Sequence, residues 1–100
     1  MGLKNAKAKG SRLERKSRDI FLDAGFIVVK AGGSLGCADL VALHPELARV
    51  TFVQVKANRW PGKLETAELE KLAKRCEPYE AWSVLIHRWD DRKGLRVKVV

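Results

Sequence analysis

A chain of 100 residues, 46% hydrophobic and 32% charged, has the composition of one small globular domain rather than of a disordered segment. It holds no apolar run of the roughly 18–20 residues that a membrane span requires and no recognisable secretory signal, so we expect a cytoplasmic protein, in a host cell if the source is viral. Twenty basic residues outweigh twelve acidic ones, and the resulting net charge of +8 favours a nucleic-acid partner over a membrane.

The positive charge is concentrated at the N-terminus. Residues 1–18 contain seven basic residues and one acidic residue. This segment is either a solvated basic surface or a binding site for a phosphate backbone, and we favour the second interpretation. We treat 1–100 as a single domain in which residues 1–10 form a flexible basic arm.

The predicted elements follow in the order α-β-β-β-α-β-β. Ser11 and Glu14 have the spacing of a capping box, and apolar residues recur at helical spacing up to Gly25, which predicts a helix over 12–24. A second helix is predicted over 65–75. Runs rich in β-branched residues predict strands over 26–30, 39–43, 50–56, 81–89 and 95–100. This order predicts an α/β domain with a central mixed five-stranded sheet flanked by helices.

The cysteines and histidines do not form a metal-binding pattern. Cys37 and Cys76 are far apart and suggest reduced thiols, while His44 and His87 have no ligand partner at zinc spacing. We therefore expect neither a disulfide nor a structural zinc site.

The third predicted strand carries polar groups where burial is expected. Side chains alternate along a strand, so Val53 and Val55 share one face while Gln54 and Lys56 share the other. A buried ammonium group requires an anion, and Asp39 at the start of the preceding strand is a candidate. A structural ion pair satisfies this requirement without any chemistry.

The same groups also suit phosphodiester hydrolysis. That reaction needs a cation on the phosphate oxygens and an activated water, which a divalent metal ion held by carboxylates supplies. A neighbouring lysine can steady the water or the developing charge. Glu14, Asp39, Gln54 and Lys56 provide these group types.

The order and spacing of several short segments resemble the PD-(D/E)XK nuclease superfamily and, within it, the archaeal-type Holliday junction resolvases. The resemblance extends from about Gly10 to Trp89. The matching segments are Lys9–Arg15, Ala24–Val29, a small-residue loop with Gly33 and Ser34, Ala38–Ala42, Val53–Lys56 and Leu69–Leu72. It implies a restriction-endonuclease-like fold.

The resemblance also implies roles for individual residues. Glu14 and Asp39 correspond to the acidic metal-site residues, Gln54 to the second ligand of the strand motif and Lys56 to the catalytic lysine. Ser34 matches a loop serine that supports catalysis in the family.

Two positions depart from the family pattern. Ala38 replaces the usual proline before the aspartate, which is a minor change. Gln54 replaces the usual glutamate, as in the VRR-type nucleases, and an amide oxygen can ligate Mg²⁺ but brings no negative charge. We expect this change to weaken metal binding or to shift the load onto Glu14.

The sequence and the resemblance together predict a magnesium-dependent endonuclease, with Mn²⁺ as a substitute, that resolves four-way DNA junctions by paired hydrolysis. No organic cofactor is expected. A junction has approximate two-fold symmetry and one chain has one site, so we expect a homodimer. The alternatives are another small nuclease of the superfamily, directed at flaps or nicks, and a non-catalytic basic nucleic-acid-binding module.

The predicted DNA contacts are mostly basic. They are Lys9, Arg12, Arg15, Lys16, Arg18, Lys30, Arg59, Trp60 and Lys63. Trp60 either stacks on a base or ribose or packs against the sheet or a partner subunit. Trp82 and Trp89 are expected on opposite faces of the fourth strand.

Overall fold

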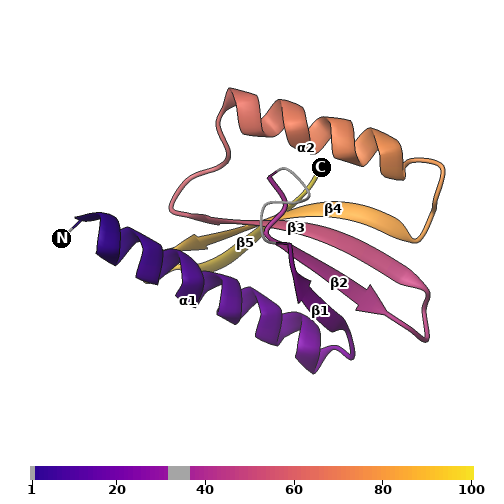
Figure 1. Cartoon of the computed structure of the whole chain (residues 1–100), viewed down its shortest axis with the longest axis horizontal. Coiled ribbons are helices and arrows are strands. Elements are labelled where there is room, and N and C mark those ends of the chain that lie inside the picture. Colours follow the sequence, from indigo (N-terminus) through magenta and orange to yellow (C-terminus); the bar gives the residue numbers. More distant parts are fainter. Residues whose placement is uncertain (1, 32–36) are drawn as a thin grey trace.

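Two helices enclose one five-stranded sheet (Figure 1). The computed structural model describes residues 2–31 and 37–100, with side chains from residue 9 onward. In chain order the elements are α1 (Gly2–Asp23), β1 (Ile27–Lys30), β2 (Leu40–His44), β3 (Arg49–Ala57), α2 (Lys63–Cys76), β4 (Trp82–Asp90) and β5 (Gly94–Val99). The predicted element order and the mixed α/β architecture are confirmed.

Strand β3 occupies the centre of the sheet, whose strands lie side by side in chain order. It pairs antiparallel with β2 and parallel with β4, while β1 and β5 pair antiparallel with β2 and β4 at the two edges. A parallel pair needs a crossover connection, and α2 provides it between β3 and β4. The first turn of α2 therefore follows directly on the C-terminal end of β3.

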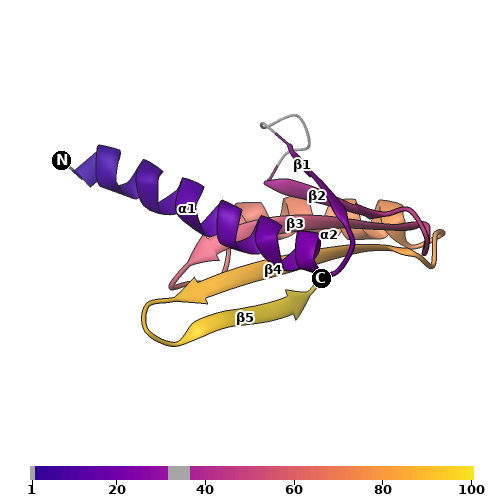
Figure 2. The ribbon, with the colours of Figure 1, turned by 90° about the horizontal axis from the view of Figure 1, so that it is seen from below.

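Each face of the sheet has its own hydrophobic core. The core on the α1 side contains Phe21, Leu40, Ala42 and Val53. The core on the α2 side contains Ala38, Phe52, Leu69, Cys76, Val84 and Ile86. The two helices lie on opposite sides of the sheet in both views (Figures 1 and 2). The predicted alternation along β3 is confirmed, because consecutive residues Phe52 and Val53 belong to different cores.

Helix α1 begins ten residues before its predicted start. Residues 2–10, predicted as a flexible arm, continue the helix, because the alanines and lysines of this stretch are strong helix formers. Ser11 lies inside the helix, so the predicted capping box with Glu14 is wrong. The predicted end is confirmed: Gly25 has a φ of +91°, which suits glycine after a helix, and the Phe26 amide donates to the carbonyl of Phe21 at 2.9 Å.

The thiols are free, as predicted. Burial raises the pKa of both Cys37 and Cys76, so both are protonated at neutral pH. Along the described residues, no helix combines the length and the apolar character that a membrane crossing demands.

Candidate active site

Asp39 is fixed to the backbone of the central strand. Its Oδ2 accepts a hydrogen bond of 2.7 Å from the amide of Val55, and its own amide donates to the carbonyl of Val53 at 2.8 Å. These two bonds hold Asp39 level with the segment of β3 that carries Gln54 and Lys56. The predicted proximity of Asp39 to this segment is therefore present in the structure.

Gln54 and Lys56 project together toward α2. Gln54 is buried, and the Lys56 side chain is 18% exposed. The Nζ of Lys56 lies 2.6 Å from Oε2 of Glu65, and Nε2 of Gln54 donates to the same oxygen at 3.0 Å. The anion that contacts Lys56 is thus Glu65, rather than Asp39 as the strand pattern suggested.

Sequence reasoning missed Glu65, although a signal for it exists. Glu65 lies in the first turn of α2, and in a β-α-β crossover this turn lies near the C-terminal end of the preceding strand. An acidic residue there is within reach of a lysine that ends the strand. The Lys56 ammonium group and its hydrogen bond to the carboxylate hold the pKa of Glu65 below its usual value, so Glu65 is ionised at neutral pH.

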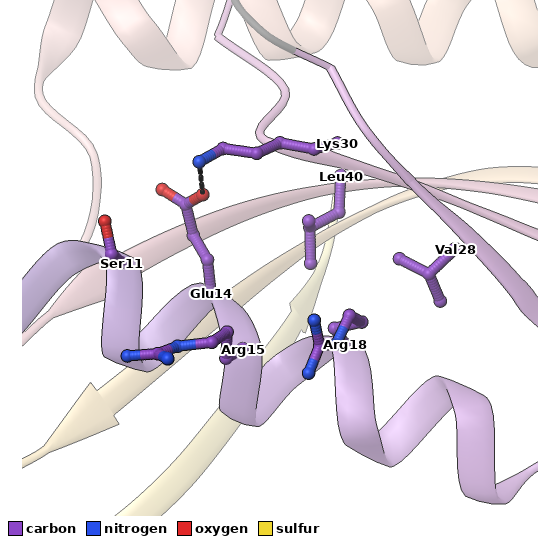
Figure 3. Close-up of a pocket in the computed structure, with 7 residues that line it drawn as sticks. All are labelled: Ser11, Glu14, Arg15, Arg18, Val28, Lys30 and Leu40. Carbon is purple, nitrogen blue, oxygen red and sulfur yellow. Dashed lines mark ion pairs between the residues drawn. The ribbon is translucent and has the colours of Figure 1, made fainter.

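Glu14 reaches the site from α1. Its Oε1 lies 3.6 Å from Nζ of Lys30, and both side chains line a groove of about 560 Å³ between the helix and the strands β1 and β2 (Figure 3). Arg15 and Arg18 line the same groove from the helix side. The groove therefore combines one carboxylate with three cations, which suits an anionic ligand beside Glu14.

The charges of three segments act on Asp39. Burial raises the pKa of this carboxyl group, and the negative charges of Glu14 and Glu65 raise it further. The Val55 amide and the positive charge of Lys56 oppose this rise. Asp39 is thus the point where α1, β3 and α2 converge electrostatically.

The donor set fits a divalent metal ion of the Mg²⁺ type. Carboxylate and amide oxygens are the ligands that this ion accepts. Among the described residues, Oε1 of Glu14 and Oε1 of Gln54 are buried without a hydrogen-bond partner, an arrangement that costs free energy unless a cation or water completes it. The described residues contain no cluster of three acidic, histidine or cysteine side chains, so any such site depends on the amide of Gln54.

The predicted DNA contacts on α1 have several environments. Lys9 forms an ion pair of 3.0 Å with Asp91, and Arg18 one of 3.1 Å with its neighbour Asp19. Lys16 lies over the ring of Trp89, 4.7 Å from its centroid. Arg12 and Arg15 are exposed. The helix thus presents a basic surface that is only partly neutralised.

The remaining predicted contacts lie near the two loops that flank the site. Arg59 and Lys63 are exposed between β3 and α2. Trp60 packs against the α2-side core, and its ring faces the cations of Arg88, Arg96 and Lys98 at 5.2–5.8 Å. Ser34 falls outside the described residues.

The other two tryptophans lie on opposite faces of β4, as predicted. The Trp82 ring packs beside Phe52 of the α2-side core, with centroids 6.0 Å apart. The indole N–H of Trp89 instead donates to Ser17 of α1 at 2.8 Å. Both side chains therefore serve packing within this fold.

A mixed sheet between two helices, with Asp39 beside the strand that holds Gln54 and Lys56, is the architecture of the PD-(D/E)XK nucleases. The family model of the archaeal Holliday junction resolvases (Hjc) matches residues 5–99. The chain belongs to this family, which consists of endonucleases that act on junctions.

A solved structure has the same fold. Hjc from Archaeoglobus fulgidus, a Holliday junction resolvase from an archaeal hyperthermophile, superposes with a TM-score of 0.70 at 21% identity, over 91% of this chain and 72% of that one. Among curated proteins, none matches the sequence significantly.

Proposed function

We propose that this chain is a metal-dependent endonuclease that resolves four-way DNA junctions by paired phosphodiester hydrolysis, leaving 5′-phosphate and 3′-hydroxyl ends. One observation carries the proposal. Asp39, Gln54 and Lys56 gather beside Glu14, and two buried oxygens of this group have no partner among the described residues. Membership of the resolvase family supports junctions as the substrate.

Three residues would hold the metal ion: Glu14, Asp39 and Gln54. Mg²⁺ is the expected ion and Mn²⁺ its substitute, and when bound it supplies a Lewis acid for the phosphate oxygens and lowers the pKa of water. Glu14 and Asp39 provide the negative charge that attracts the ion, and Gln54 provides a neutral oxygen. The Val55 amide keeps the Asp39 carboxylate in place throughout.

Lys56 acts on the phosphate and its attacking water. Its ammonium group carries a full positive charge beside Glu65 and can donate hydrogen bonds to a phosphate oxygen as charge develops there. Ser34 is proposed to assist catalysis from its loop, as the family resemblance implies.

The substrate backbone is proposed to follow the cationic groove. Arg15, Arg18 and Lys30 line the groove next to Glu14, so a phosphate bound there lies near the metal ligands. Lys9, Arg12 and Lys16 extend the basic surface along α1, and Arg59, Trp60 and Lys63 extend it past the end of β3. These contacts recognise backbone charge and shape rather than base sequence.

The test is incubation with a synthetic four-way junction, with and without Mg²⁺. Asp39→Asn keeps an oxygen that can accept from the Val55 amide, so it should fold normally yet lose about a hundredfold or more in nicking rate, because charge stabilisation by the metal is worth several kcal/mol. Lys56→Ala should show a similar loss. Lys71→Ala removes an exposed lysine of α2 and should leave the rate unchanged.

The outcomes separate the alternatives. Competition by linear duplex as effective as that by junctions identifies a nuclease directed at other structures. Salt-sensitive DNA binding without any Mg²⁺- or Mn²⁺-dependent nicking identifies a non-catalytic binding module.

A further inference from the structure

Glu65 contacts both polar side chains of β3 through a single oxygen. Its Oε2 accepts from Nε2 of Gln54 at 3.0 Å and lies 2.6 Å from Nζ of Lys56. Its Oε1 accepts from the amide of Gly62 at 3.5 Å, which ties the carboxylate to the start of α2. The carboxylate is thus held at both oxygens, and its position is fixed relative to the strand.

This contact determines which way the Gln54 amide points. A glutamine side chain has a donating end and an accepting end, and only the nitrogen end can bond to a carboxylate. The bond to Glu65 therefore turns Oε1 of Gln54 away from α2. That oxygen is buried and has no partner among the described residues, so the amide presents an unused ligand atom.

Glu65 also supplies charge that the strand lacks. An amide at position 54 brings no negative charge, whereas Glu65 places one within hydrogen-bond distance of it. The negative charge of Glu65 is felt at Asp39 as well. The pocket thus contains three carboxylates in its surroundings, although only Glu14 and Asp39 were expected from the sequence.

We propose that Glu65 is a positioning residue that makes Gln54 serve as a cation ligand: it orients the amide oxygen into the site and contributes the negative charge that an amide cannot. The inference rests on the proposed metal-dependent function. Glu65 itself contacts neither metal nor substrate in this scheme, and acts through Gln54 and Lys56.

The decisive experiment exchanges the two side chains. Glu65→Gln removes the charge and keeps the size, and it should weaken Mg²⁺ and Mn²⁺ binding, measured by calorimetry without DNA, by about tenfold or more, with a parallel loss of junction nicking. The double variant Gln54→Glu with Glu65→Gln restores one carboxylate and one amide in contact. It should recover cation affinity and nicking to within about threefold of the unaltered chain, well inside the single-variant loss.

Two controls exclude a purely structural role. Glu68→Gln removes the same charge from an exposed position one turn along α2 and should change neither readout. A glutamine at position 65 can still accept from Gly62, so the capping of α2 and the thermal unfolding midpoint should change little.

Either of two results overturns the inference: unchanged cation affinity in Glu65→Gln, or a folded double variant no better than the single one. Failure of the unaltered chain to bind a divalent cation at all instead overturns the proposed function, and the inference with it.

Discussion

Glu14 has no structural task that a glutamine could not perform. It lies in the interior of α1, where glutamate and glutamine have similar helix propensities, and its 3.6 Å ion pair is with a lysine that is 69% exposed. Ion pairs of this kind contribute little stability. Its buried unpaired oxygen therefore has to be explained by binding.

Glu14→Gln should accordingly separate folding from activity. We expect an unchanged thermal unfolding midpoint and a loss of about tenfold or more in Mg²⁺-dependent nicking, because one carboxylate leaves the site. Glu80→Gln, which removes an exposed carboxylate elsewhere, is the matched control. Normal turnover by Glu14→Gln would show that this residue is not a metal ligand.

His87 links the stability of the fold to pH. It is buried against α1, its ring stacks on Phe21 with centroids 5.3 Å apart, and its Nδ1 lies 2.9 Å from Oγ of Ser17. The Ser17 hydroxyl accepts from Trp89 and is free to donate to the histidine, which favours a neutral ring. Burial lowers the pKa of His87 to about 4.

The sign of the effect follows from this depressed pKa. Below pH 6.5 the unfolded chain protonates His87 while the folded chain does not, so stability is complete above pH 6.5 and decreases as the pH falls toward 4. The shift corresponds to about 3 kcal/mol. Urea unfolding across this range should show the loss, and His87→Gln should flatten it. A slope that persists in His87→Gln but disappears in His44→Gln would assign the effect to the wrong histidine.

At the scale of elements, α1 forms the outer wall of the cationic groove. Arg15 and Arg18 line the groove from this helix, opposite Lys30 of β1 (Figure 3). Arg18 pairs only with its exposed neighbour Asp19, so both guanidinium groups are available to phosphates.

Removing these charges should change the salt dependence of DNA binding. In the double variant Arg15→Gln with Arg18→Gln, the slope of log affinity against log salt should become shallower by about two, one for each lost phosphate contact. The double variant Lys71→Gln with Lys74→Gln removes two exposed charges from α2 and should leave the slope intact. Equal slopes in both variants would place the DNA elsewhere.

Local patterns were enough to predict most elements. The alternation along β3 and the glycine after α1 are decided by neighbouring residues, and both were predicted. The start of α1 was not, because a capping pattern at Ser11 and Glu14 has no effect inside a stretch whose other residues already favour helix.

The site was predictable only where it lies on one segment or its immediate partner. Asp39, Gln54 and Lys56 follow from strand register. Glu65 does not, because its contact with Lys56 depends on how the crossover places the first turn of α2 over β3. The pattern showed that Lys56 needs an anion, and the three-dimensional arrangement determines which one.

For the molecule as a whole, one chain supplies one candidate site, whereas a four-way junction needs two cuts. Both edge strands expose apolar side chains, including Ile27 and Val29 on β1 and Val97 and Val99 on β5. Such surfaces are available for a second copy to cover. A symmetric homodimer is the simplest assembly with two sites.

A cruciform plasmid distinguishes paired from single cuts. If two subunits act within one bound complex, both strands are cut before dissociation and the product is linear DNA. Premixing with an excess of Asp39→Asn chains should form dimers with one active subunit, which can make only one cut, so nicked circles should replace linear product. Sedimentation of the unaltered chain should give twice the mass of a single chain. A monomeric mass, with linear product unaffected by the inactive subunits, would contradict the dimer, because two independent cuts need no shared complex.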